Sequence, residues 1–267
     1  MTKEASTLKA DSLDIVQRYD ALMYEASHIR YFLGSDFTNF GYWDADTKDQ
    51  KQACENLMDR LIALIPERKG KILDVACGKG GTTRHLLKYY TPSSVTAVNL
   101  SAKQLETARA RAPGCGFVLM DAAHLAFEDA TFDDIICVEA AFHFVTRERF
   151  LREALRVLKP GGRLVLSDIL MTREAEQAKP YRTEENYLEN PAAYGELGRS
   201  VGFSNVDVID TTEPCWHGCY WHAVRQGHEK YLSGEVDLAG LKRFLQLTYR
   251  RAKDIRHYLL ASLRKGA

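Results

Sequence analysis

The stretch Ile72-Leu73-Asp74-Val75-Ala76-Cys77-Gly78-Lys79-Gly80-Gly81 carries most of the information about the fold of this chain. Residues 71–75 form a short apolar run that predicts a buried strand, and the glycines follow that strand at once. Glycines in this place let a ligand approach the backbone closely, and the free amides at the start of the next helix attract an anionic group. The stretch therefore predicts a ligand-binding loop between a strand and a helix.

Strands and helices are expected to alternate on either side of this loop. Residues 8–33 predict one or two helices and residues 48–65 another. Further strands are expected at residues 94–99, 116–120, 132–139, 163–168 and 205–210, and further helices at 80–89, 101–111, 147–158 and 191–201. Ser101 is expected to cap its helix, Gly202 to end the last one, and residues 159–162 to form a turn. Such alternation predicts an α/β fold, a Rossmann-like sheet flanked by helices, with its ligand at the carboxyl ends of the strands.

The C-terminal part of the sequence is less regular. Residues 213–253 are aromatic at first and helical later, and residues 255–265 either extend the last helix or form a closing strand. The strand is the preferred interpretation, which makes the sheet seven-stranded. The predicted organisation is an N-terminal helical cap over 1–47, a Rossmann-like core over 48–212, a helical lid insertion over 213–253 and the closing strand of the core over 254–267.

The composition excludes several classes of protein. The 36 basic and 36 acidic residues give a formal net charge of zero, so no global field draws the chain to nucleic acid or an anionic membrane. No apolar run could span a bilayer and no signal peptide is recognisable, so we expect a cytoplasmic protein with reduced cysteines. Cys215, His217, Cys219 and His222 have a spacing that matches no common zinc pattern, so no metal site is expected.

The glycine loop also resembles a known family motif. Asp74-x-x-x-Gly78-x-Gly80 is similar to motif I of the class I S-adenosylmethionine-dependent methyltransferases, and further segments match that family in order over residues 45–210. Residues 98–105 resemble the ribose-binding segment, residues 120–122 the adenine segment, and residues 132–135 and 158–164 the later motifs. The resemblance implies S-adenosyl-L-methionine as cofactor and S-adenosyl-L-homocysteine as product. It assigns cofactor binding to Asp74, Ala76, Cys77, Gly78, Gly80, Asn99, Leu100, Gln104, Asp121 and Ala122.

Several details of this match bear on how the cofactor is held. The carboxylate of Asp74 can face an ammonium group, or it merely caps a turn. Asp121 is expected to accept from the adenine amino group, with a helix cap as the alternative. The family usually has an acidic residue at the position of Asn99, whose amide both donates and accepts but carries no charge. The spacing Gly78-x-Gly80 lacks the third glycine of the dinucleotide fingerprint, which disfavours a nicotinamide oxidoreductase.

Residues after the fourth and fifth expected strands are candidates for catalysis. His143 follows the fourth strand on the ligand side, and its titration range suits proton transfer, so it is expected to be the general base. Asp168 ends the fifth strand and is expected to orient the imidazole. The alternatives are that His143 packs over the cofactor and that Asp168 faces water or Arg173. Glu139 is expected to touch the cofactor or to support His143. The pair of His143 and Asp168 resembles that of natural-product sugar and macrolide O-methyltransferases.

Two N-terminal segments resemble the same branch of the family. This branch contains erythromycin-type O-methyltransferases, tocopherol methyltransferases and phosphoethanolamine methyltransferases. Arg18-Tyr19-Asp20 is similar to a latch helix over the cofactor, so Tyr19 is expected to pair with His143. Phe40-Gly41-Tyr42-Trp43 is similar to a segment near the methyl donor, so Tyr42 is expected at the cofactor site. The alternative for both tyrosines is ordinary core packing.

These expectations lead to one predicted function and several alternatives. The chain is predicted to transfer a methyl group to a small-molecule acceptor, preferably a hydroxyl of a secondary metabolite. The alternatives are a carbon acceptor on an isoprenoid or quinone and, after that, a cofactor-binding protein without catalysis. A nucleic-acid methyltransferase is disfavoured because the chain lacks a basic recognition domain. The acceptor, the acceptor atom and the oligomeric state, a homo-oligomer included, stay open.

Overall fold

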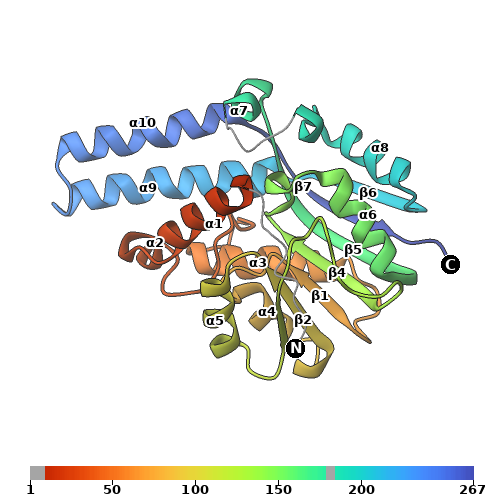
Figure 1. The fold of residues 1–267 in the computed structure, drawn as a ribbon. Coiled ribbons are helices and arrows are strands. Elements are labelled where there is room, and N and C mark those ends of the chain that lie inside the picture. Colours follow the sequence, from red (N-terminus) through yellow and green to blue (C-terminus); the bar gives the residue numbers. More distant parts are fainter. Residues whose placement is uncertain (1–9, 179–183) are drawn as a thin grey trace.

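The structure, a computed structural model, describes residues 10–178 and 184–267 (Figure 1). Within these residues one sheet has seven strands in the order β3-β2-β1-β4-β5-β7-β6. The strands are β1 (Ile72–Val75), β2 (Val95–Asn99), β3 (Gly116–Leu119), β4 (Phe132–Val138), β5 (Leu158–Met171), β6 (Asn205–Asp210) and β7 (Ile255–Arg264). Strand β7 is antiparallel to both of its neighbours, and the five strands from β3 to β5 pair in parallel. The predicted Rossmann-like α/β fold is confirmed.

Helices pack on both faces of this sheet. They are α1 (Ala10–Met23), α2 (Ala26–Tyr31), α3 (Gln50–Ala63), α4 (Gly81–Leu86), α5 (Ala102–Arg111), α6 (Arg147–Val157), α7 (Arg173–Gln177), α8 (Pro191–Val201), α9 (Gly218–Leu232) and α10 (Leu238–Asp254). Short 3-10 turns occur at η1 (Pro92–Ser94), η2 (Ala141–His143) and η3 (Glu184–Asn186), and η4 (Glu213–His217) is a π-helical turn. None of the helices described has both the length and the apolar character needed to cross a membrane.

Most helix ends lie where the sequence predicts them. The hydroxyl of Ser101 accepts from the amide of Gln104 at 3.1 Å and caps α5. Gly202 ends α8 with a left-handed φ of 118°. Helix α4 is shorter than the predicted range 80–89 and ends at Leu86. Beyond Leu86 the backbone forms hydrogen bonds with the three-residue spacing of a 3-10 helix. The amide of Lys88, for example, donates to the carbonyl of His85 at 3.1 Å.

The predicted turn at residues 159–162 is instead part of strand β5. Leu158 pairs with Phe132 and Arg163 with Asp134, so the intervening residues bulge out of the ladder with β4. They bond to the C-terminal end of the chain: the amide of Gly161 donates to Gly266 at 3.0 Å, and Lys265 donates to Gly162 at 2.9 Å. The strand stays continuous through this bulge because the C-terminal backbone supplies the hydrogen bonds that β4 does not.

The end of the chain closes the sheet as a strand. Of the two interpretations of residues 255–265, the strand is confirmed: β7 lies between β5 and β6. The preceding residues, 213–254, form η4, α9 and α10, and the two long helices run side by side away from the sheet (Figure 1). The first nine residues of the predicted N-terminal cap lie outside the described residues.

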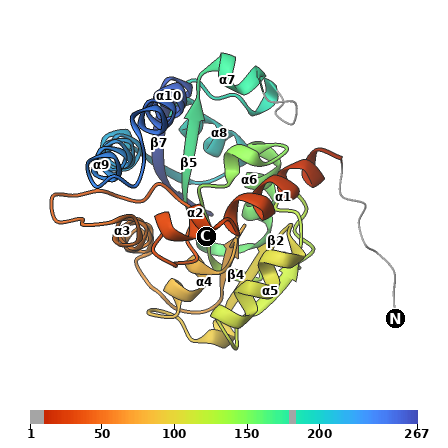
Figure 2. The same ribbon diagram turned by 90° about the vertical axis from the view of Figure 1, so that its left-hand side faces the viewer.

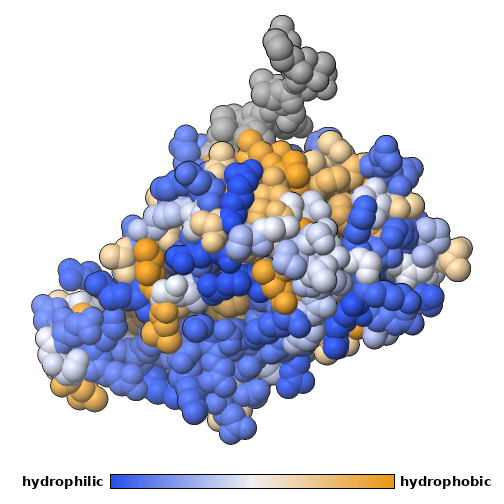
Figure 3. All heavy atoms as spheres, turned by 90° about the horizontal axis from the view of Figure 1, so that it is seen from below, coloured by the Kyte–Doolittle hydropathy of each residue, from blue (hydrophilic) through white to orange (hydrophobic). Residues whose placement is uncertain are grey.

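Alternating strand residues divide the core between the two faces of the sheet. On one face, Leu73 and its neighbours pack with residues of α6 and α8. On the other, Ile72 packs with α3 and with residues near Trp216. This division follows from the pleat, because successive side chains of a strand point to opposite faces. The surface in Figure 3 is mostly hydrophilic, and its hydrophobic residues form separate patches.

Helix α1 crosses the carboxyl ends of the parallel strands, in front of the sheet in Figure 2. It contacts the loop after β1, where Nζ of Lys79 donates to the carbonyl of Met23 at 3.0 Å. It also contacts the segment after β2 through Asp20 and the segment after β4 through Tyr19. The helix therefore covers the edge of the sheet at which the ligand is expected.

Candidate active site

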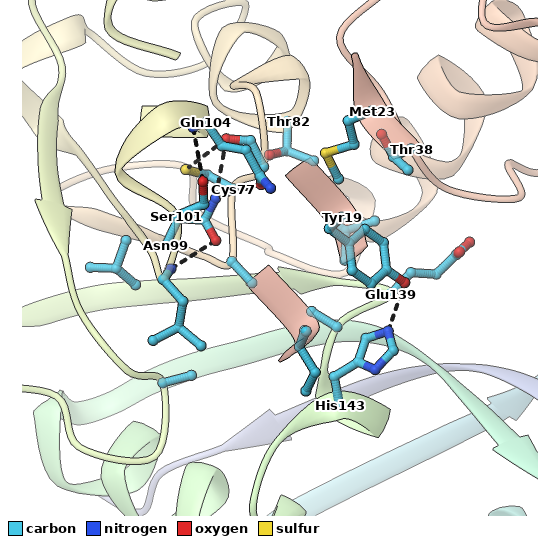
Figure 4. Close-up of a pocket in the computed structure, with 18 of the residues that line it drawn as sticks. Tyr19, Met23, Thr38, Cys77, Thr82, Asn99, Ser101, Gln104, Glu139 and His143 are labelled. Atoms are coloured by element: carbon cyan, nitrogen blue, oxygen red, sulfur yellow. Dashed lines mark hydrogen bonds between the residues drawn. The ribbon is translucent and has the colours of Figure 1, made fainter. Parts of the chain in front are cut away.

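A cavity lies at this edge, between α1 and the loops that follow β1, β2, β3 and β4 (Figure 4). The predicted site residues that line it are Tyr19, Ala76, Cys77, Gly78, Asn99, Leu100, Gln104, Ala122, Glu139 and His143. Asp74, Gly80, Asp121, Tyr42 and Asp168 are not lining residues. Figure 4 shows Asn99, Ser101 and Gln104 at one end of the cavity and Tyr19 and His143 at the other.

The glycine loop is shaped by close backbone contacts. Ala76, Gly78 and Gly80 all have positive φ angles, of 61°, 55° and 90°. A Cβ on Gly80 would lie 2.8 Å from Cα of Ala108 in α5, so Gly80 supports the loop from outside the cavity. Only residues without a bulky side chain allow the loop to turn this sharply against a helix.

Asp74 lies beneath this loop and is almost fully buried. Its Oδ2 accepts from the hydroxyls of Thr82 and Thr83, both at 2.7 Å, and its Oδ1 has no hydrogen-bond partner among the residues described. Burial raises the pKa of Asp74 to about 6, against the effect of these two hydroxyls. Since Thr82 lines the cavity, Asp74 acts on the site through Thr82 and leaves one buried acceptor for a donor group.

The polar end of the cavity is built from the segment after β2. Nδ2 of Asn99 donates to Oε1 of Gln104 at 2.8 Å, and Oδ1 of Asn99 accepts from the amide of Leu100 at 2.9 Å. Ser101 and Gln104 also bond to Asp20 of α1. Asp20 was not predicted as a site residue, although it follows Tyr19 directly, because nothing in the local sequence specifies its distant partners.

Two predicted cofactor residues point elsewhere. Oδ1 of Asp121 accepts from the amide of Ala123 at 2.9 Å and closes a turn, while its neighbour Ala122 lines the cavity. No helix follows Asp121 before β4, so the alternative of a helix cap is wrong. The guanidinium of Arg60 lies 4.6 Å from the ring centre of Tyr42, which is the packing alternative for this tyrosine. The segment carrying Tyr42 turns away because its amide donates to the carbonyl of Ala53, in α3, at 2.8 Å.

The other end of the cavity carries the predicted base. His143 is the last residue of the 3-10 turn η2, directly after β4. The hydroxyl of Tyr19 and Nε2 of His143 are hydrogen-bonded at 2.7 Å, and the two rings meet edge to face. The ring of Phe142 lies 3.9 Å from that of His143, measured between ring centres. The expected pair of Tyr19 and His143 is therefore present, with one member from the cap and one from the core.

The carboxylate of Asp168 is hydrogen-bonded to Arg147 and to backbone amides, and not to the imidazole of His143 as expected. Its Oδ2 accepts from Nε of Arg147 at 2.7 Å, and its Oδ1 accepts from the amides of Phe142 and Ile169, each at 2.9 Å. Both charged side chains are buried. Arg147 also donates to the backbone carbonyl of Asn186. Asp168 thus holds the turn that carries His143 through its backbone; Arg147 was missed because an arginine at a helix start is usually exposed.

Glu139 joins three parts of the chain at the end of β4. Its backbone has a positive φ of 48°, and its Oε1 accepts from the amide of Phe40 and the hydroxyl of Tyr258, both at 2.6 Å. Burial raises the pKa of Glu139 to about 8, although both donors favour the charged form. The contact with Phe40 explains why the segment 40–43 matters to the site without contributing Tyr42.

The residues present fit S-adenosylmethionine. A loop with positive φ angles, a free acceptor on Asp74 and a cluster of amide and hydroxyl groups near Asn99 suit the methionine and ribose parts of that cofactor. No group of three or more potential ligands able to hold a metal ion occurs in the described part of the chain.

Comparison with known proteins supports the same family. Residues 73–166 match the family model described as a methyltransferase domain. The chain is 34% identical over 226 residues to methyltransferase GfsG of Streptomyces halstedii, covering 79% of this chain and 80% of the relative. It is 36% identical over 195 residues to a 27-O-demethylrifamycin SV methyltransferase of Amycolatopsis mediterranei, covering 66% and 71%. It is 29% identical over 248 residues to the O-methyltransferase cnsE of Penicillium expansum, covering 82% and 85%.

Solved structures show the same fold at lower identity. The [4+2]-cyclase SpnF superposes with a TM-score of 0.70 and 22% identity, over 96% of this chain and 97% of the other. A geranyl diphosphate C-methyltransferase from Streptomyces coelicolor superposes with a TM-score of 0.69 and 15% identity, over 96% and 98%. With the relatives above, these findings show that the chain belongs to the class I S-adenosylmethionine-dependent methyltransferases that act on small molecules, and that S-adenosylmethionine is its cofactor.

Proposed function

We propose that the protein methylates a hydroxyl group of a small secondary metabolite, with His143 as the general base. The observation that carries this proposal is the hydrogen bond of 2.7 Å between Tyr19 and Nε2 of His143, two residues that line the cavity. Relatives described as an O-methyltransferase and as a 27-O-demethylrifamycin SV methyltransferase support an oxygen acceptor. The prediction that His143 is the base is therefore kept, and its contact with Tyr19 supports it.

The proposed chemistry needs a base because a neutral alcohol is a weak nucleophile. S-adenosylmethionine, when bound, supplies a methyl group on a positively charged sulfur. The acceptor oxygen would take the methyl group that the cofactor supplies, leaving S-adenosylhomocysteine, while its hydroxyl proton passes to the hydroxyl oxygen of Tyr19 and the proton of Tyr19 passes to Nε2 of His143. Tyr19 thus links the acceptor to the base, and α1 brings Tyr19 into place. Proton removal and exclusion of water from the cavity then depend on the same helix.

The apolar walls of the cavity indicate the kind of acceptor. Phe37, Val138 and Phe144 line the cavity, together with Ile15 and Val16 of α1. Apolar walls around one base favour an apolar or amphipathic molecule with a reactive hydroxyl. A phenol or a polyketide alcohol meets both conditions.

A carbon acceptor is the second candidate. The fold is shared with a geranyl diphosphate C-methyltransferase, and the apolar walls also suit an isoprenoid or a quinone. The same fold in a protein described as a [4+2]-cyclase means that the fold alone does not choose the reaction. The position of the new methyl group in the product, determined by NMR, separates oxygen from carbon acceptors.

The test combines a panel of acceptors with variants of the base. Purified enzyme is incubated with S-adenosylmethionine and phenols, polyketide alcohols, sugar hydroxyls and isoprenoids, and S-adenosylhomocysteine and methylated products are quantified. His143→Ala is expected to lower turnover by about a hundredfold or more, while calorimetry shows nearly unchanged binding of S-adenosylhomocysteine. Normal turnover of a hydroxyl acceptor by His143→Ala would refute the base assignment. Methylation only at carbon would replace the proposal by the second candidate.

A further inference from the structure

The ribose end of the cavity has no carboxylate on strand β2. In nucleotide-binding folds of this architecture an acidic side chain near the second strand bonds the ribose hydroxyls, because each hydroxyl proton needs an acceptor. Asn99 occupies this place, and its oxygen accepts from the amide of Leu100 while its nitrogen donates to Gln104. The amide of Asn99 is therefore engaged within the protein and adds no charge.

A carboxylate reaches this corner from α1 instead. Oδ1 of Asp20 accepts from the hydroxyl of Ser101 and from Nε2 of Gln104, both at 2.7 Å. Ser101 and Gln104 line the cavity, whereas Asp20 is not a lining residue. Figure 4 shows the hydrogen bonds that join Asn99, Ser101 and Gln104 at this end. The carboxylate of Asp20, in the helical cap, is thus hydrogen-bonded directly to two residues that line the cavity.

The direction of these bonds decides which atoms meet a ligand. Because Nε2 of Gln104 donates to Asp20, the other end of the amide, Oε1, is held on the side of Asn99. The hydroxyl hydrogen of Ser101 also points to Asp20, and of the two lone pairs on its oxygen one accepts from the amide of Gln104 and one remains for another donor. The carboxylate of Asp20 therefore arranges two acceptors at the cavity wall, as a ribose diol requires.

We propose that Asp20 is the positioning residue for ribose recognition in this protein and takes over, from the cap, the role of an acid on β2. This inference rests on the family and its cofactor and not on the role of His143. Cofactor affinity and docking of α1 are then linked, because Asp20 reaches Ser101 and Gln104 only when α1 lies over the cavity. Bound cofactor in turn stabilises the docked helix that brings Tyr19 to His143.

A purely structural role for Asp20 predicts different behaviour. In that case the carboxylate only fastens α1, as Tyr24 does through its hydrogen bonds to Thr107 (2.6 Å) and to the carbonyl of Lys103 (3.1 Å). Tyr24 directly follows the last residue of α1 and is not a lining residue. Tyr24→Phe is therefore the matched control, since it weakens the docking of α1 without changing the charge at the ribose corner.

The experiment measures ligand binding by calorimetry, without turnover. S-adenosylhomocysteine is titrated into the full chain and into Asp20→Asn, Asn99→Asp, the double variant and Tyr24→Phe. A second pair of probes, 5′-methylthioadenosine and its 2′-deoxy counterpart, isolates a ribose hydroxyl. Circular dichroism and thermal melting without ligand establish that each variant folds.

The expected results follow from the charge. Asp20→Asn is expected to bind S-adenosylhomocysteine about tenfold more weakly, because a charge-assisted bond is replaced by a neutral one. Asn99→Asp in that background is expected to regain most of the loss, since it puts a carboxylate back beside Gln104. Tyr24→Phe is expected to change affinity less than about threefold. The loss caused by Asp20→Asn is expected to shrink for the 2′-deoxy probe.

Three results would overturn the proposal. The first is unchanged binding of S-adenosylhomocysteine by Asp20→Asn. The second is a loss of affinity in Tyr24→Phe as large as that in Asp20→Asn, which would assign Asp20 to fastening the helix. The third is an equal loss for 5′-methylthioadenosine and its 2′-deoxy counterpart in Asp20→Asn. None of these measurements depends on His143, so they stand apart from the test of the proposed function.

Discussion

Nε of Arg147 donates a hydrogen bond of 2.7 Å to Oδ2 of Asp168, and this ion pair is buried beneath the turn that carries His143. The other carboxylate oxygen, Oδ1, accepts from the amide of Phe142 at 2.9 Å. An acid at the end of β5 thereby influences the imidazole through the backbone to which the imidazole is attached. Arg147 and Asp168 are positioning residues in this arrangement.

Removing one partner of this pair is expected to destabilise the protein. Asp168→Asn leaves the guanidinium of Arg147 buried without its counter-ion, and we expect a loss of about 3–5 kcal/mol in the free energy of unfolding. Denaturant titration with S-adenosylhomocysteine absent measures this loss. Arg152→Ala is the control, because its ion pair with Glu148 is largely exposed and contributes at most about 1 kcal/mol. Equal stabilities of Asp168→Asn and the parent would contradict the burial argument.

Tyr19→Phe tests the bond between the cap and the base. The variant keeps the ring and loses the hydroxyl that meets Nε2 of His143, so we expect kcat to fall about tenfold with little change in binding of S-adenosylhomocysteine. Adding His143→Ala to Tyr19→Phe should lower kcat no further than His143→Ala alone, because the two residues act as one unit. Additive losses would show that they act separately. Tyr42→Phe, outside the cavity, serves as the control.

Glu139 is expected to make stability depend on pH. Its pKa is raised by burial to about 8, whereas the unfolded chain releases this proton near the ordinary value of about 4.5. Between these values the folded state binds more protons than the unfolded state. The free energy of unfolding therefore falls as the pH rises and levels off above about pH 8.

The measurement compares the parent with Glu139→Gln between about pH 5 and about pH 9. Asp74 and Asp134, with pKa values raised to about 6 and about 7 by burial, add slopes of the same sign in both proteins. The difference between the two curves isolates Glu139: the parent should lose stability relative to Glu139→Gln as the pH rises, because the amide of glutamine does not ionise. Parallel curves would mean that the carboxyl of Glu139 ionises in the folded protein as it does in the unfolded chain.

Gly81→Ala is expected to weaken cofactor binding through a clash outside the glycine loop. A Cβ at this position would lie 2.8 Å from the backbone carbonyl carbon of Asp36, a residue that lines the cavity. The loop or the segment of Asp36 must shift, and we expect at least a tenfold loss of affinity for S-adenosylhomocysteine. Gly266→Ala is the control, because its nearest neighbour would be the Cβ of Ser204 at 3.8 Å. An unchanged affinity would show that the cavity tolerates the shift.

Local patterns predicted most of the fold. Apolar runs marked the strands, and short-range chemistry marked helix ends such as Ser101 and Gly202. The prediction for residues 159–162 was wrong: their sequence has the features of a turn, yet they belong to β5. The hydrogen bond from Gly161 to Gly266, near the chain end, holds them there. A pattern within four residues cannot report a hydrogen bond to a segment about a hundred residues away.

The candidate site could be predicted only in part, because local sequence patterns report residues at strand ends but not the path of long segments. Residues that end or follow strands, such as Asn99, Gly78 and His143, reach the cavity because the parallel sheet brings the carboxyl ends of these strands to one edge. Residues that depend on the path of a long segment were harder to place. Tyr42 turns away towards Arg60, although its segment contacts Glu139 through Phe40.

The sequence by itself determined the fold class and the cofactor loop, because both follow from residues close together along the chain. Only the tertiary structure decided which charges meet: Asp168 pairs with Arg147, and Asp20 reaches Gln104 across 84 positions. Such pairs form when helices pack on a sheet and bury polar groups, which must then find partners wherever the chain supplies them. The glycine loop predicted where the cofactor lies, and packing of the cap placed the groups proposed to act on it.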